Sequence, residues 1–203
     1  SFDTFAQRTV VRLKTPWNSQ PGMAWQSHDD TLLAEWLQRH GIRIGSEIAG
    51  EAVQAVSREN SFDSLQDYLH GLQWDGYSRL NTLASLYFGC PIESTGNQYL
   101  RWAAIGAVAR GMQPGAKVDT VPVLEGAQGT LKSSALAVWF DPLGRNWFRD
   151  DLPPLESKDA AIQLCGVWCI ELSELEAVNN RHAELEKVKA FISRRRDSYR
   201  PPY

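Results

Sequence analysis

The spacing of the apolar residues changes near Gly115, and this change divides the chain into two regions. Before it, apolar side chains recur at helical intervals in five segments, which are 31–42, 47–60, 61–72, 74–89 and 97–115. After it, the run VDTVPVLEG (118–126) is short, apolar and rich in valine, which predicts a strand, with Pro122 near the strand's start or beside an unpaired position. The sequence therefore predicts a mainly helical region over 1–115, with one short strand at TVVRLK (9–14), and a core of another kind over 116–203.

The predicted strand leads into GAQGTLKSS (126–134), here named the phosphate loop, and SSALAVWF (133–140) continues as a predicted helix. A strand, a glycine-bearing loop, a Lys-Ser pair and a helix in this order are typical of a loop that binds a nucleoside triphosphate. Backbone N–H groups and the positive end of the helix dipole would together bind the polyanion. The alternative is an ordinary glycine-rich turn before a helix that carries an exposed lysine.

Each residue of the phosphate loop has an expected role. Lys132 would contact the β- and γ-phosphates, the Ser133 hydroxyl would bind Mg²⁺, and Ser134 would make a further phosphate contact. The candidate nucleotide-binding residues are Gly126, Ala127, Gln128, Gly129, Thr130, Leu131, Lys132, Ser133 and Ser134. Leu131 stands where this pattern has its second glycine, and we expect it to adopt the right-handed helical conformation and to weaken nucleotide affinity without abolishing it.

Two acidic residues follow a second predicted strand. VWCI (167–170) ends at Glu171, and Glu174 lies three residues later. If the chain turns helical there, both carboxylates face the phosphates, where one would hold hydrated Mg²⁺ and the other would polarise the attacking water. Lys132, Glu171 and Glu174 are thus the candidate catalytic residues, and Ser133 and Glu171 the candidate metal ligands, although the sequence does not decide which glutamate binds the metal. The alternative is a solvated strand end.

The C-terminal segment is basic in a chain whose net charge is -3. From Arg181 to Tyr203 there are seven Lys or Arg residues and three acidic ones, and a helix is predicted over 181–192. Guanidinium groups interleaved with tyrosines suit the phosphates and bases of single-stranded DNA. The candidate DNA-binding residues are Lys189, Arg194, Arg195, Arg196 and Arg200. The alternative is a solvated helix end that pairs with the acidic remainder of the chain.

Four segments in order resemble the virulence-associated protein E family, whose members are similar to superfamily 3 helicases and viral primase-helicases. They are YLHGLQWDGYSRL (68–80), ARGMQPGAKVDTVPVLEGAQGTLKSS (109–134), GVWCIELSEL (166–175) and KAFISRRRDSYRPPY (189–203). The resemblance implies ATP hydrolysis coupled to DNA replication in a ring of subunits. It also implies a sensor segment and an arginine finger beyond Tyr203, so we expect a chain of this length to hydrolyse ATP poorly.

The sequence as a whole predicts an α/β fold, with part of a P-loop NTPase core preceded by the mainly helical region. The expected function is that of an ATP-binding and ATP-hydrolysing, helicase-like replication protein of a prophage or genomic island. One alternative is a nucleotide-binding DNA-binding or assembly module with little turnover, and another is a P-loop small-molecule kinase. Because no run approaches about 20 apolar residues and the three cysteines have no C-x-x-C spacing, we expect a cytoplasmic protein without membrane contact.

Overall fold

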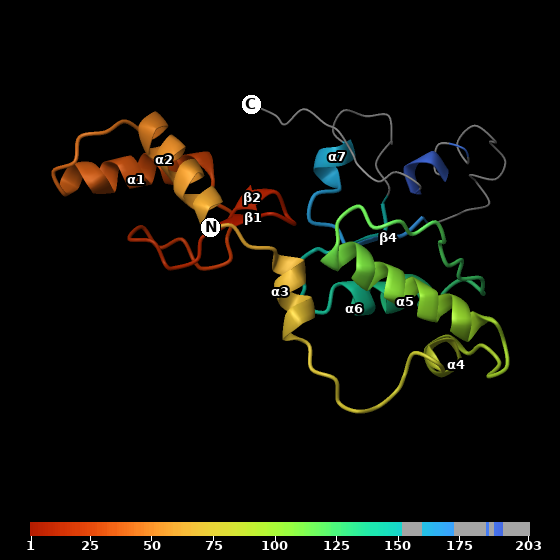
Figure 1. Ribbon diagram of the computed structural model, residues 1–203. Coiled ribbons are helices and arrows are strands. Elements are labelled where there is room, and N and C mark those ends of the chain that lie inside the picture. Colours follow the sequence, from red (N-terminus) through yellow and green to blue (C-terminus); the bar gives the residue numbers. More distant parts are fainter. Residues whose placement is uncertain (152–159, 173–185, 187–188, 193–203) are drawn as a thin grey trace. The chain divides into compact units, whose positions relative to one another are not determined.

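The computed structural model describes residues 1–151, 160–172, 186 and 189–192 (Figure 1). The chain divides into two compact units, Ser1–Tyr68 and Leu69–Tyr203. Unit 2 thus contains two helices that precede the phosphate loop in the sequence as well as the loop itself. The boundary predicted at residues 115 and 116 does not coincide with this division.

Unit 1 combines a two-stranded sheet with a pair of helices. Strands β1 (Phe2–Asp3) and β2 (Arg8–Thr9) are antiparallel, with Phe2 opposite Thr9. Helices α1 (Ser27–Arg39) and α2 (Ser46–Glu59) pack against each other, and α3 (Ser64–Gly71) contains the boundary between the units. The three helices predicted in this region are confirmed. The strand predicted at 9–14 is confirmed only at its start.

A buried carboxylate organises the turn before α1. Asp29 is 2% exposed, and it accepts hydrogen bonds from Trp17 Nε1 at 2.8 Å, Ser19 Oγ at 2.9 Å and the N–H of Gln26 at 2.9 Å. Burial raises the pKa of Asp29, but the hydrogen bonds from Trp17, Gln26 and Ser19 outweigh burial, so the pKa is lowered overall. The charged carboxylate therefore joins the N-terminal arm to the first turn of α1.

Unit 2 places helices beside a short parallel sheet. Its helices are α4 (Leu83–Phe88), α5 (Gly96–Met112), α6 (Lys132–Phe140) and α7 (Ala160–Gln163). Strands β3 (Phe148–Arg149) and β4 (Cys169–Ile170) pair in parallel, so Phe148 lies opposite Cys169. The predicted helices at 74–89, 97–115, 133–140 and 158–165 and the predicted strand at 167–170 are confirmed, although several are shorter than expected.

Aromatic side chains hold α5, α6 and the sheet together. The ring of Trp168 meets those of Phe140 and Trp147 edge to face, with centroids 5.1 Å and 6.3 Å apart. Trp168 Nε1 also donates to the carbonyl of Ala107 in α5 at 3.0 Å. Phe140 and Trp147 are buried, so these tryptophans act as packing anchors, as aromatic residues with one polar atom commonly do.

The segment predicted as a strand at 118–126 forms no ladder in the structure. It follows α5, where Arg110 donates to the carbonyl oxygens of Ala116 at 3.2 Å and Val118 at 3.4 Å. Pro122 has no N–H for a ladder, and no described strand pairs with this segment. Arg110 therefore joins only the start of this segment to α5.

The predicted C-terminal helix is described only in part. Glu186 and residues 189–192 are helical, and a guanidinium nitrogen of Arg110 donates to the carbonyl of Ile192 at 3.2 Å. Arg110 thus contacts both the start of the predicted DNA-binding segment and the chain that leads to the phosphate loop. The remainder of the predicted helix lies outside the described residues.

Candidate phosphate-binding site

The phosphate loop is exposed and ends at the N-terminus of α6. Gly129 has a φ of 80°, and Leu131, the N-cap residue, has a φ of 59° and a ψ of 27°. The expectation of a right-handed conformation at Leu131 is therefore wrong. The loop reaches the helix through a left-handed residue, which explains why glycine suits this position and why a side chain there is strained.

The ammonium group of Lys132 folds back onto the phosphate loop. It donates to the carbonyl oxygens of Gly126 and Ala127, each at 3.0 Å, and lies 3.3 Å from Thr130 Oγ1. Thr130 Oγ1 in turn donates to the carbonyl of Ala127 at 2.9 Å. The positive charge predicted to meet phosphates is therefore held at the centre of the loop by neutral oxygens, which a more strongly accepting anion could replace.

Ser133 and Glu171, the two candidate metal ligands, lie side by side in the structure. Ser133 Oγ donates to Glu171 Oε1 at 2.7 Å. The parallel pairing of β3 with β4 continues to Glu171, whose N–H donates to the carbonyl of Arg149 at 2.7 Å. A helix N-terminus and a strand end thus place a hydroxyl and a carboxylate side by side.

The second oxygen of Glu171 makes the site suitable for a cation. Oε2 is buried and has no hydrogen-bond partner among the described residues. A buried carboxylate oxygen without a partner is costly, and Mg²⁺ prefers carboxylate and hydroxyl oxygens together with phosphates and water. Ser133 and Glu171 therefore fit the metal predicted for this site. The described residues contain no group of three or more His, Cys, Asp or Glu side chains that could hold an ion without such additional ligands.

A cysteine next to the site carries no reactive thiolate. Burial, and secondly the carboxylate of Glu171, raise the pKa of the Cys169 thiol to about 11. The thiol therefore stays protonated near neutral pH and contributes packing beneath the site.

The other predicted site residues are accounted for in part. Ser134 is exposed on the first turn of α6, and Lys189 forms an ion pair with Glu186 at 2.8 Å. Glu174, Arg194, Arg195, Arg196 and Arg200 lie outside the described residues. The structure consequently brings together Lys132, Ser133 and Glu171 and leaves the DNA-binding prediction as a prediction.

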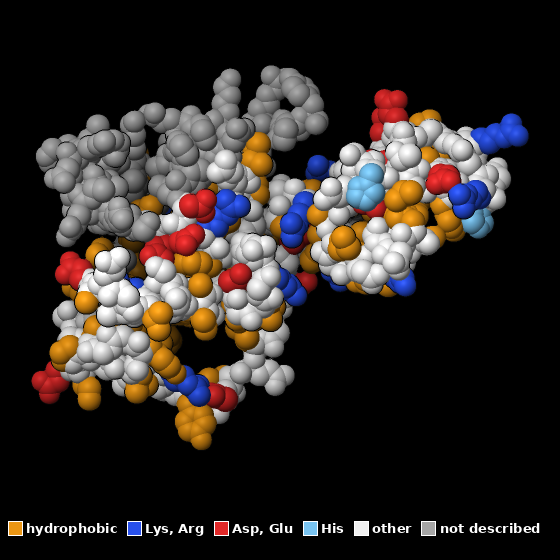
Figure 2. All heavy atoms as spheres, turned by 180° about the vertical axis from the view of Figure 1, so that it is seen from behind, with side chains coloured by type: hydrophobic (Ala, Val, Ile, Leu, Met, Phe, Trp, Pro, Cys, Tyr) orange, Lys and Arg blue, Asp and Glu red, His pale blue; other side chains and the backbone are white. Residues whose placement is uncertain are grey.

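The segment WDGYSRL (74–80) lies within one of the four family-like segments, and the turn that its sequence predicts at Asp75-Gly76 is present in the structure. In this segment Arg79 binds Asp75 with two hydrogen bonds, at 2.8 Å and 2.7 Å, across a turn in which Gly76 has a φ of 90°. The turn presents Trp74, which is 79% exposed, and exposed hydrophobic side chains are visible on this unit (Figure 2). The Asp-Gly pair is the sequence signal that predicts this turn, and the pairing of Arg79 with Asp75 is what the structure adds.

Comparison with known proteins supports one family. A family model described as the virulence-associated protein E-like domain matches residues 69–203, about two thirds of the chain. This range coincides with unit 2. No curated protein matches the chain. Within the described residues, no helix has the length and apolar character required to cross a membrane.

Proposed function

The chain belongs to the virulence-associated protein E-like domain family, and we propose that it is an ATP-binding, ATP-hydrolysing and helicase-like replication protein of a prophage or genomic island. Residues 116–203 are then the front part of a P-loop NTPase core. The proposal includes action on single-stranded DNA in the cytoplasm and assembly of several copies into a ring.

The hydrogen bond between Ser133 and Glu171 is the observation that carries the proposal. Two residues chosen for metal binding from separate motifs lie 2.7 Å apart, beside the lysine chosen for phosphate binding. A glycine-rich turn without a ligand gives no reason for a strand-end carboxylate to lie at the start of the following helix. A site for a metal–nucleotide complex does give one.

The residues of the site have separate tasks in this proposal. The ammonium of Lys132 leaves the carbonyls of Gly126 and Ala127 and donates to phosphate oxygens, while N–H groups at the start of α6 bind the same anion. Ser133 and Glu171 hold Mg²⁺, which when bound neutralises charge on the phosphates. Of Glu171 and Glu174, the residue that is less engaged with the metal orients the attacking water.

The DNA-binding part of the proposal concerns the chain after α7. Lys189 with Arg194, Arg195, Arg196 and Arg200 would contact the phosphates of a single strand. Arg110 supports a link between the two functions, because it contacts Val118 on the way to the phosphate loop and Ile192 beside the basic residues.

The test is ATP turnover with and without single-stranded DNA. DNA should raise the rate, and Lys132→Ala and Glu171→Gln should each lower it by about a hundredfold, as loss of a charge-stabilising group typically does. Lys14→Ala and Glu51→Gln make the same chemical changes at exposed positions of unit 1 and should leave the rate unchanged. Equal rates in all four variants would contradict the proposal.

A second function is favoured by the backbone of Leu131 and by the internal hydrogen bonds of Lys132. A strained loop whose lysine is already satisfied by carbonyls suits a module that binds nucleotide and changes assembly or DNA affinity with little turnover. Tight ATP binding that shifts the oligomeric state, with no phosphate release in the presence of DNA, would select this function over the first.

A further inference from the structure

An apolar cavity of about 440 Å³ lies in unit 2 between α4, α5 and the segment that precedes the phosphate loop. Its lining includes Phe88, Tyr99, Trp102, Ala103, Val121 and Leu124. The volume falls in the range of pockets that take small organic ligands, and such pockets are usually lined by apolar and aromatic side chains.

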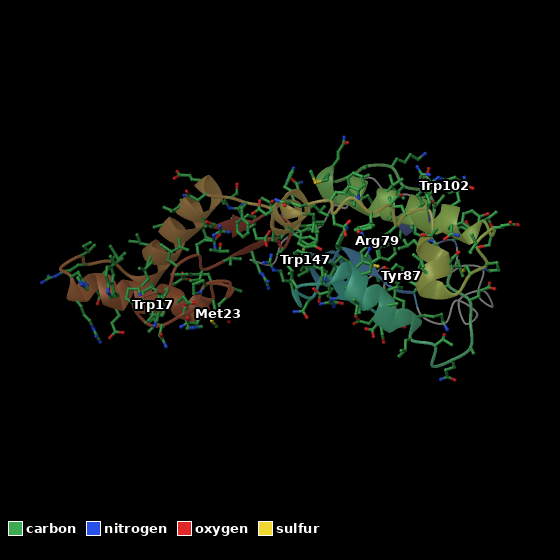
Figure 3. All side chains as sticks on the ribbon, turned by 90° about the horizontal axis from the view of Figure 1, so that it is seen from below. Trp17, Met23, Arg79, Tyr87, Trp102 and Trp147 are labelled. Atoms are coloured by element: carbon green, nitrogen blue, oxygen red, sulfur yellow. The ribbon has the colours of Figure 1, made fainter. Side chains whose placement is uncertain are left out.

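Two of the aromatic residues that line this cavity are about half exposed. Tyr99 and Trp102 are 55% and 47% exposed, and their ring centroids are 5.9 Å apart with planes inclined at 56°. Trp102 projects from α5 (Figure 3). Half-exposed rings offer their faces to a planar ligand, and stacking of a base on such a face contributes affinity without requiring a particular sequence of hydrogen bonds.

The cavity is continuous with the phosphate loop along the chain. Leu124 lines the cavity, and Gly126 begins the loop two residues later, which places them within about 7 Å of each other even if the chain is fully extended. Within the described residues, the N–H groups of Val121, Val123 and Leu124 make no hydrogen bond. A ligand that occupies both the cavity and the phosphate loop would contact apolar surface, aromatic rings and free backbone N–H groups in the cavity. Its other end would contact the phosphate loop.

We propose that this cavity binds the base and ribose of the nucleotide whose phosphates occupy the phosphate loop. This inference rests on the proposed nucleotide binding, and it adds Tyr99 and Trp102 as the residues against which the base stacks. The segment 120–124 then has a function that explains its lack of sheet pairing, because its backbone is left available to the ligand.

Calorimetric titration with Mg²⁺–ATP and with inorganic tripolyphosphate distinguishes binding of the base and ribose from binding of the phosphates. We expect Trp102→Ala to weaken ATP binding about fivefold or more and to leave tripolyphosphate binding unchanged. Lys132→Ala should weaken both ligands. Trp74→Ala is the matched control, since Trp74 is an exposed tryptophan of the same unit outside the cavity.

Each outcome decides a different point. ATP and tripolyphosphate affinities that are both unchanged in Trp102→Ala would overturn the cavity assignment while leaving the phosphate loop intact. Failure of the unmodified protein to bind either ligand would overturn the proposed function and this inference together.

The thiol of Cys90, which also lines the cavity, gives a second measurement without a substitution. ATP should slow its alkylation, followed by peptide mass spectrometry, and tripolyphosphate should not. Equal protection by both ligands, or by neither, would count against the inference.

Discussion

The hydroxyl of Ser133 donates to Glu171 Oε1 at 2.7 Å, although 38 positions separate the two residues in the sequence. Ser133 lies on the first turn of α6, and Glu171 directly follows β4. The contact therefore depends on the packing of α6 against the β3–β4 sheet, and it reports whether the site is assembled.

Removal of this hydroxyl should destabilise the protein. In Ser133→Ala, Glu171 loses its hydrogen-bond donor while Oε2 remains buried and without a partner, so we expect the free energy of unfolding to fall by about 0.5–1.5 kcal/mol. Ser134→Ala removes the neighbouring exposed hydroxyl and should be close to neutral. Urea denaturation measures both variants, and equal stabilities for the two would contradict the structural role of the contact.

Leu131 should be replaceable by glycine with a gain in stability. A left-handed backbone costs an L-residue about 1–2 kcal/mol, whereas glycine loses about 0.5–1 kcal/mol of additional chain entropy on folding. The difference favours Leu131→Gly, and its unfolding midpoint should rise slightly. Leu131→Ala keeps a Cβ and should show no such gain. The same glycine substitution should tighten ATP binding, and a lower midpoint for it than for the alanine variant would argue against the strain.

The sequence predicted the helices well because their apolar stripes are long and periodic. Helices α2 and α5 form where these stripes were predicted, although Ile48 and Val56 of the predicted α2 stripe are more than half exposed. Local pattern was sufficient in these cases because each element's own periodicity determined its structure.

Other features depend on contacts that the sequence does not display. The chain at 118–126 has the composition of a strand, but a ladder requires a partner strand, and no described strand pairs with this segment. The left-handed backbone of Leu131 results from the path of the loop into α6 and overrides the residue's preference. The burial of Asp29 by Trp17 likewise arises from tertiary packing. Residues such as Glu174, which lie outside the described part of the chain, keep the status of predictions.

Asp75 should titrate well below its ordinary range. Its pKa is lowered from 3.8 to about 2, first by the hydrogen bonds from Arg79 and then by the N–H of Tyr77. In Arg79→Met we expect the pKa to return toward 3.8, measured by NMR titration of the Asp75 carboxyl. Because the folded pKa is the lower one, the stabilisation from this pair is present above about pH 4 and is lost as the pH falls toward 2. If the titration midpoint of Asp75 is the same in Arg79→Met as in the unmodified protein, Arg79 does not cause the lowered pKa.

Trp17→Phe should destabilise unit 1 in a pH-dependent manner. The variant removes one donor to the buried Asp29 carboxylate, and a hydrogen bond to a charged group contributes about 1.5–3 kcal/mol. The pKa of Asp29 is lowered in the folded protein, so its stabilisation is present above 3.8 and lost as the pH falls through the lowered value. The decrease in the free energy of unfolding caused by Trp17→Phe should therefore be large at neutral pH and small at acidic pH. Urea denaturation at several pH values tests this. If the decrease in the free energy of unfolding is the same at every pH, the substitution acts through the packing of the ring and not through its hydrogen bond to Asp29.

Gly106 sets the distance between α5 and the chain that leads to the phosphate loop. A Cβ at this position would lie 2.9 Å from Val118 Cγ1, a contact too short to be tolerated without movement. We expect Gly106→Ala to cost about 1–3 kcal/mol of unfolding free energy, as overpacking typically does.

A second substitution separates this contact from the general effect of placing alanine at a helical glycine. Gly71→Ala is the control, because a Cβ there meets no atom within 4 Å. Since alanine at 118 lacks the clashing Cγ atoms, Gly106→Ala combined with Val118→Ala should be less destabilised than the sum of the single changes, by about 0.5 kcal/mol or more in a double-mutant cycle. If the two changes in the free energy of unfolding add exactly, residues 106 and 118 do not contact each other, and Gly106 does not set the distance between α5 and the chain before the phosphate loop.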